Sequence, residues 1–246
     1  LIKGVSATAE TPLWMQERLR RSGLRSLGPI VDVTNYVLLE MGQPLHAFDA
    51  AKLSGGIEVR LAHADEAFSL LNDQEIKANS ETLVIADAEK ALALAGIMGG
   101  SESAVSDSTQ DIFLECAFFN PSFMMGKARY YGLHTDSSHR FERGVDAEMQ
   151  SRAIERATQL IVEIAGGSVG AITEVVAEEY LPQRPAVTLR EQRIKRILGV
   201  ALAETEVEGI LQRLGMAVVK DAEGWQVTPP GFRFDIAIEA DLIEEL

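Results

Sequence analysis

The densest run of reactive side chains covers residues 134–144, which contain two histidines, two serines, two carboxylates and two arginines. Such a set could ligate a metal ion or build a serine nucleophile with its base. His134 and His139 are five residues apart, whereas a helical zinc site uses i,i+4 spacing, and no cysteine lies in the run. No strained strand-to-helix turn surrounds Ser137 or Ser138. The run is therefore predicted to be a solvated loop, although it holds more hydrogen-bond donors than a linker needs.

Glu115 is the most unusual single residue, because it interrupts the apolar run 112–119. Strand alternation places it on the same face as Phe113 and Ala117. A buried carboxylate costs free energy unless something hydrogen-bonds to it. Glu115 is therefore expected either at a sheet edge or in a site that binds a polar group.

A glycine-rich segment, residues 96–101, follows an apolar strand, which is where phosphate-binding loops occur. Its spacing matches neither the dinucleotide fingerprint nor the Walker pattern. Gly96, Gly99 and Gly100 are therefore expected to let backbone N–H groups approach a ligand, or simply to form a tight turn.

The last residues of the sequence hold five acids and no base. If the chain is helical from about Ile238, three of these acids project from one face at three- and four-residue spacing: Asp241, Glu244 and Glu245. This group suits a hard divalent cation, or is only a solvated helix face.

Capping and turn signals predict the elements that position these residues. Helices are expected over 13–22, 31–41, 121–131 and 146–165, and strands over 57–61, 82–86, 91–97 and 111–118. Gly42 ends the second helix, and Gln43-Pro44 forces the chain into an extended stretch that carries His46. The sequence predicts a loop over residues 133–144.

A domain boundary is expected near residue 180, where prolines follow a strand-like segment. Beyond it, Thr188 with Glu191 and Thr205 with Glu208 form two capping boxes, and residues 216–228 form a hairpin. The predicted fold class is α+β. Residues 1–180 form a β-sandwich-like sheet core flanked by helices, and residues 181–246 form a small helix-helix-hairpin module similar to a winged helix, truncated at its C-terminus.

Composition limits the partners and the compartment. The 246 residues include 23 Lys and Arg against 37 Asp and Glu, a net charge of −14, which makes the chain a poor candidate for non-specific wrapping of nucleic acid and predicts that any such contact is local. A single cysteine and the lack of a secretory signal favour the reducing cytoplasm. The start without Met and the end inside a helix suggest a segment of a longer chain.

Five motifs in order and register extend over essentially the whole chain, which makes them more specific than any single pattern. They are Val31-Asp32-Val33-Thr34-Asn35-Tyr36, Gly42-Gln43-Pro44-Leu45-His46-Ala47-Phe48-Asp49, Gly96-Ile97-Met98-Gly99-Gly100, Leu114-Glu115-Cys116-Ala117-Phe118-Phe119, and His139-Arg140-Phe141-Glu142-Arg143-Gly144-Val145-Asp146. With these motifs the chain resembles the central part of the bacterial phenylalanyl-tRNA synthetase β-subunit family, namely its editing module and most of the small module that follows.

The resemblance implies hydrolysis of tyrosine wrongly esterified to the phenylalanine tRNA. A hydrophobic synthetic pocket rejects the extra tyrosine hydroxyl imperfectly, whereas a second site can select for it. In the family pattern Glu115 accepts the phenol O–H, helped by backbone near Gly96 and Gly99.

The resemblance also assigns residues to the ester end of the substrate. His46 positions or polarises the attacking water, and Thr34, Asn35 and Thr135 hold the amino group and the terminal ribose. The identity of any general base stays open. Ser137 stands where the family usually has alanine against the aromatic ring, so its hydroxyl either narrows the pocket or adds a polar contact.

Finally, the resemblance implies partners outside this segment. It maps magnesium ligation in the full enzyme onto Asp235, Asp241, Glu244 and Glu245, in a site shared with the α subunit of a heterotetramer, while editing itself needs no metal. The aminoacylated end of the tRNA is the expected partner, and ATP binding belongs to the full ligase. The alternative is a structural, RNA-docking segment of the synthetase with no catalysis of its own.

Overall fold

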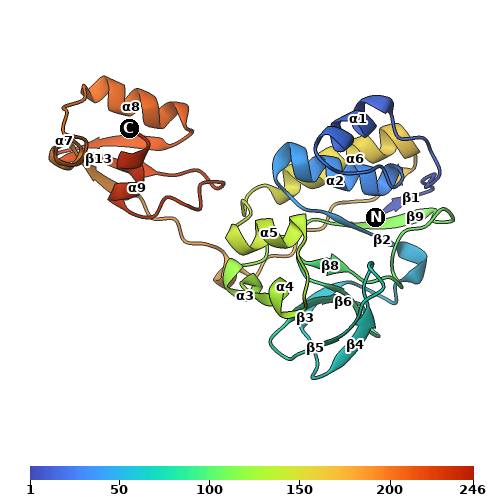
Figure 1. Ribbon diagram of the computed structural model, residues 1–246. Coiled ribbons are helices and arrows are strands. Elements are labelled where there is room, and N and C mark those ends of the chain that lie inside the picture. The colour runs from blue at the N-terminus through green and yellow to red at the C-terminus, as the bar shows by residue number, and fades with distance from the viewer. The chain divides into compact units, whose positions relative to one another are not determined.

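The sheet that carries His46 and Glu115 joins four short strands that are far apart in the sequence. The strands are β1 (Ile2–Lys3), β2 (His46–Asp49), β9 (Asp111–Glu115) and β10 (Ser168–Val169). They pair antiparallel in the order β10-β1-β9-β2. The computed structural model describes all 246 residues, and they divide into two units, 1–178 and 179–246 (Figure 1).

Three helices cover one face of this sheet. They are α1 (Leu13–Arg21), α2 (Pro29–Met41) and α6 (Gln150–Ala165). Val33 and Val37 of α2 and Ile161 of α6 share a buried core with Ile112 and Leu114 of β9. Burial of this apolar surface drives the helices onto the sheet.

The opposite face of the sheet packs against a second set of strands. The strands β3 (Glu58–Leu61), β6 (Leu83–Ala86), β7 (Ala91–Leu94) and β8 (Met98–Gly99) form a sheet in the order β3-β6-β7-β8, beside the hairpin of β4 (Glu66–Ser69) and β5 (Glu75–Ala78). A short 3-10 helix, η1 (Ala50–Lys52), follows β2. Phe48 is fully buried in this second core and Phe113 packs against it. Because side chains alternate along a strand, β9 therefore contributes to both cores.

Three short helices close this second core: α3 (Pro121–Met124), α4 (Lys127–Tyr130) and α5 (Asp136–Arg143). The single helix predicted over 121–131 is wrong, because Gly126, at φ +74°, breaks it into two. The predicted loop over 133–144 is also wrong. Most of it is α5, which buries Phe141.

The second unit has a three-stranded antiparallel sheet and three helices, after a 3-10 turn, η2 (Glu178–Tyr180). The elements run β11 (Val187–Arg190), α7 (Glu191–Leu198), α8 (Glu204–Arg213), β12 (Ala217–Asp221), β13 (Gly224–Thr228) and α9 (Glu239–Glu244), with strand order β11-β13-β12. The predicted hairpin is confirmed. Thr188 caps no helix, because it lies in β11 and its hydroxyl bonds to Gln226.

The predicted α+β class, with antiparallel sheets flanked by helices, is confirmed. None of the helices is both long enough and apolar enough to cross a membrane.

Candidate active site

His46 and Glu115 lie directly opposite each other on neighbouring strands. The antiparallel register of β2 and β9 pairs His46 with Glu115 and Phe48 with Phe113. Opposite side chains in such a pair project from the same face with Cβ atoms about 5 Å apart. The side chains of His46 and Glu115 therefore project from the same face of the sheet toward the second sheet, where both can contact one ligand.

A buried glutamine links the segments next to these two strands. Gly42 ends α2 in the left-handed conformation, and Gln43 follows with no exposed surface. Its amide nitrogen donates to the carbonyl oxygens of Pro44 and Ala117, each at 2.9 Å, and its amide oxygen accepts from Gln150 at 3.0 Å. The segment before His46 is thereby tied to the segment after Glu115.

The imidazole of His46 is held by packing rather than by hydrogen bonds. Its ring meets Phe48 edge to face, with centroids 4.5 Å apart and planes at 80°. Its Nε2 atom is buried and has no hydrogen-bond partner. Burial lowers the pKa of His46 to about 4, so the ring is neutral at pH 7.

The carboxyl of Glu115 is partly buried and receives no hydrogen bond from the protein. Burial raises its pKa to about 8, which leaves the acid mostly protonated at pH 7. The neighbouring Cys116 thiol also has a raised pKa, chiefly from burial and then from Glu115. No cation offsets the cost of ionising Glu115, so the site offers a neutral acid beside a neutral imidazole.

The glycine turn of residues 96–100 is required for close packing. A Cβ atom on Gly99 would lie 2.7 Å from Nε2 of His46 and closer still to Cε1. A Cβ atom on Gly96 would lie within 3.0 Å of Met124, Phe141 and Phe119. Gly96 also has φ +66°, which disfavours side chains. Gly99 therefore packs against His46, whereas Gly96 packs against the second core, and its role in binding stays a prediction.

Thr135 joins this turn to α5. Its hydroxyl accepts from the backbone N–H of Ser138 at 3.0 Å and donates to the carbonyl oxygen of Ile97 at 2.9 Å. In return the Ser138 hydroxyl accepts from the Thr135 N–H, which completes a capping box. Ser137 follows in the first turn of α5, partly buried. The Thr135 hydroxyl thus has a structural task in the absence of substrate.

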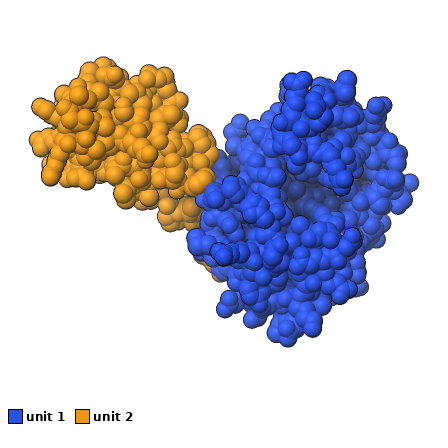
Figure 2. Space-filling model, viewed as in Figure 1, with its two compact units in different colours: residues 1–178 blue, residues 179–246 orange.

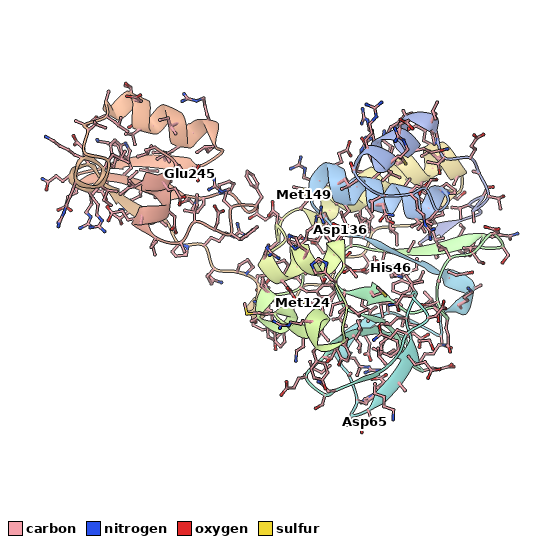
Figure 3. The ribbon with its side chains drawn as sticks, viewed as in Figure 1. His46, Asp65, Met124, Asp136, Met149 and Glu245 are labelled. Carbon is pink, nitrogen blue, oxygen red and sulfur yellow. The ribbon has the colours of Figure 1, made fainter.

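The face between the two layers is hollowed. Figure 2 shows the hollow in residues 1–178, and Figure 3 labels His46 and Asp136, the first residue of α5, beside the same region.

Thr34 and Asn35 come from α2, the helix that contacts β2. The Thr34 hydroxyl donates to the carbonyl of Val31 at 2.9 Å, and the side chain is buried. No hydrogen bond joins either residue to His46, Glu115 or Thr135. The structure therefore brings together His46, Glu115 and the glycine turn, with Thr135 bonded to that turn. Thr34 and Asn35 lie on α2 and form no hydrogen bond with any of them.

The four acids predicted as magnesium ligands do not form a ligand set in this chain. Asp235 and Glu245 both form ion pairs with Arg233. Asp241 accepts the backbone N–H groups of Ala237 and Ile238 at 2.8 and 2.9 Å, which caps α9. No three His, Cys, Asp or Glu side chains converge so that they could hold a metal ion. The guanidinium of Arg233 is the positive charge that neutralises Asp235 and Glu245. Magnesium ligation stays a prediction.

Two residues at the site carried little or no signal in the sequence. Phe48 lies two positions after His46 in an extended stretch, so strand alternation could have placed it on the same face. Leu71 packs beside Gly99 from a hairpin that was not predicted. Its contact depends on long-range pairing, which no local pattern reveals.

Comparison with known proteins adds two families. The B3/4 domain matches residues 1–166, and the tRNA synthetase B5 domain matches residues 187–246. The chain is 66% identical to the phenylalanine-tRNA ligase beta subunit of Methylococcus capsulatus, 57% to that of Nitrosococcus oceani and 56% to that of Vibrio cholerae, each over 246 residues. These alignments cover 100% of this chain and 31% of each relative, so the chain spans about a third of their length.

One solved structure is also similar: an N-terminal fragment of the phenylalanyl-tRNA synthetase beta subunit from Pyrococcus horikoshii. It matches with a TM-score of 0.43 and 15% identity, over 99% of this chain and 67% of that one.

Proposed function

The chain belongs to the B3/4 domain family, with a tRNA synthetase B5 domain after it, and on that premise we propose that residues 1–178 edit misacylated tRNA. The reaction is hydrolysis of tyrosine from the phenylalanine tRNA, within a phenylalanine-tRNA ligase. Water adds to the ester carbonyl, the bond to the ribose oxygen breaks, and free tyrosine leaves the 3′ end. The observation that carries the proposal is the cross-strand pair of His46 and Glu115 against Gly99.

Glu115 selects the tyrosine side chain. A mostly protonated carboxyl can accept the phenol O–H through one oxygen and donate to the phenol oxygen through the other. Phenylalanine would leave this partly buried acid without a partner, a loss of about 1–3 kcal/mol. Discrimination by an unpaired polar group is stronger than discrimination by the size of a pocket.

His46 acts on the water that attacks the ester. The neutral ring has a buried nitrogen without a partner, so it can accept a hydrogen bond once substrate and water rearrange the site. Thr34 and Asn35 on α2 and Thr135 on α5 hold the amino group and the terminal ribose. Ser137 in the first turn of α5 contacts the aromatic ring.

The rest of the proposal concerns the longer protein. The aminoacylated end of the tRNA enters residues 1–178, and other domains hold its backbone, which is consistent with the acidic charge of −14. The α subunit, ATP and the magnesium ions belong to the synthetic reaction in the cytoplasm. Any magnesium bound by Asp235, Asp241, Glu244 and Glu245 would require Arg233 to release two of them.

The test is deacylation of purified Tyr-tRNA by the full-length synthetase and its variants. His46→Ala and Glu115→Ala should each lower the rate at least tenfold. His63→Ala and Glu89→Ala remove the same residue types from exposed positions and should leave the rate unchanged. A wild-type enzyme no faster than the two site variants would contradict editing and favour a structural, RNA-docking role.

A further inference from the structure

Leu71 is a large apolar side chain left half exposed beside the site. It follows Leu70, which is fully buried, in the turn between β4 and β5, and 49% of its surface is accessible. Isolated exposed leucines are ordinary on protein surfaces. Leu71 differs from such leucines because it is held beside Gly99 and His46, where it can contact a ligand of the site.

The backbone of Leu71 is fastened to the glycine turn. Its N–H donates to the carbonyl of Gly99 at 3.0 Å, and Leu70 forms an antiparallel bridge with Gly100. One residue further, the N–H of Ser101 donates to the carbonyl of Ser69 at 2.9 Å. These bonds hold the end of the hairpin in register with the turn, so Leu71 has a fixed place beside Gly99.

The side chain of Leu71 and the imidazole of His46 both pack against Gly99. A Cβ atom built on Gly99 would lie 3.2 Å from Cδ1 of Leu71 and 2.7 Å from Nε2 of His46. Gly99 is therefore flanked by a neutral polar ring from β2 and by an apolar side chain from the hairpin. An aromatic side chain with a terminal hydroxyl is suited to a site edged by both kinds of group.

We propose that Leu71 is a specificity-determining residue of the editing site, whose side chain packs against the aromatic ring of the misattached amino acid. This inference rests on the proposed function. Leu71 interacts with the ring, whereas Glu115 interacts with the hydroxyl. Because the leucine is half exposed without substrate, covering it with a ring removes apolar surface from water and strengthens binding about tenfold.

The assignment of the ring to Leu71 and the hydroxyl to Glu115 makes the two residues separable. Leu71→Ala should weaken binding of a tyrosyl and of a phenylalanyl group by the same factor. Glu115→Ala should weaken only the tyrosyl group. Neither change should alter binding of an alanyl group, which reaches neither residue.

The experiment measures the dissociation constants of three non-hydrolysable probes, adenosines that carry tyrosine, phenylalanine or alanine through a 3′ amide. The protein is the full-length synthetase, with its synthetic site blocked by saturating phenylalanyl adenylate analogue. Leu71→Ala should raise the constants for the two aromatic probes about tenfold, Leu71→Met should restore them, and Leu61→Ala, at a leucine exposed by 46% on β3, should do nothing.

Deacylation of Tyr-tRNA by the same variants tests the role of Leu71 separately from the proposed editing function. Leu71→Ala should raise KM about tenfold with little change in kcat. If the wild-type enzyme deacylates Tyr-tRNA but its dissociation constants for the aromatic probes equal those of Leu71→Ala, the role of Leu71 is wrong and the proposed function stands. A wild-type enzyme that does not deacylate Tyr-tRNA overturns the proposed function, and the role of Leu71 with it.

Discussion

The imidazole of His46 lies against the α-carbon of Gly99, so closely that no side chain fits between them. Strand β2 supplies the ring and β8 supplies the glycine, so this contact joins the two sheets of the larger unit. Phe48 also packs against the ring, edge to face. The imidazole of His46 can occupy this position only because residue 99 is glycine and has no Cβ atom.

Gly99→Ala should displace the imidazole. The new methyl group would meet Nε2 of His46 at 2.7 Å, and overpacking of this kind costs about 1–3 kcal/mol. Thermal or urea unfolding of the variant measures the loss, and deacylation of Tyr-tRNA should fall with it. Gly56→Ala is the control, because a Cβ atom there meets nothing and its φ is not positive, so its stability should be unchanged or slightly higher. Equal stability of the two variants would contradict the contact.

Thr135→Val should destabilise the protein by about 1–2 kcal/mol. The valine cannot cap α5 at the N–H of Ser138, and it leaves the carbonyl of Ile97 without its donor. Thr135→Ser keeps both bonds and should retain stability and deacylation alike. A serine variant that is stable but inactive would show that the methyl group of Thr135 has a role in the reaction that its hydrogen bonds do not explain.

Tyr131→Phe should destabilise the second core by about 1 kcal/mol or more. The phenol oxygen lies 2.6 Å from the hydroxyl of Thr82 and accepts the N–H of Asn79 at 3.1 Å, all at buried or partly buried positions. Tyr130→Phe provides the control at a neighbouring tyrosine that is 67% exposed. Chemical denaturation should separate the two variants, and no difference between them would rule out this network as a source of stability.

Stability should depend on pH through the two buried groups, with opposite signs. His46 has a pKa of about 4 in the folded state, below its ordinary value of 6.5, so its contribution is present at neutral pH and lost as pH falls from 6.5 to 4. Glu115 has a pKa of about 8, above its ordinary value of 4.5, so the unfolded state ionises first and stability declines as pH rises toward 8.

Between pH 6.5 and 8 only the Glu115 effect remains. The wild type should lose about 2 kcal/mol over this interval relative to Glu115→Gln, which cannot ionise. Urea unfolding at several pH values measures the difference. Parallel curves for the two proteins would show that Glu115 ionises as an ordinary surface acid.

The local signals of the sequence located about half of the strands and the C-terminal end of α2. Gly42 and Pro44 were sufficient to predict an extended stretch at His46, and the apolar run around Glu115 was sufficient to predict a strand. The pairing of these two strands could not be predicted, because they lie far apart in the sequence and no local pattern reveals their register. The site itself is therefore a consequence of tertiary structure.

The hydrophobic pattern of the sequence does not reveal the polar helix α5 or the short β4–β5 hairpin. α5 has a single strongly buried apolar residue, Phe141, so its run resembles a loop, although Thr135 is a standard N-cap. The β4–β5 hairpin turns at Asp73, which has φ +64°, a left-handed conformation that aspartate adopts more readily than most residues. The contact of Leu71 with Gly99 depends on long-range pairing between the hairpin and the glycine turn, so it could not be predicted from local pattern.

The most direct test of the account is the ratio of kcat/KM for Tyr-tRNA to kcat/KM for Phe-tRNA, measured for deacylation by the full-length synthetase and by Glu115→Ala. The account predicts that the ratio falls at least tenfold in the variant, since only tyrosine loses a partner. An equal fall for both substrates, with the ratio unchanged, would contradict selection of the hydroxyl by Glu115.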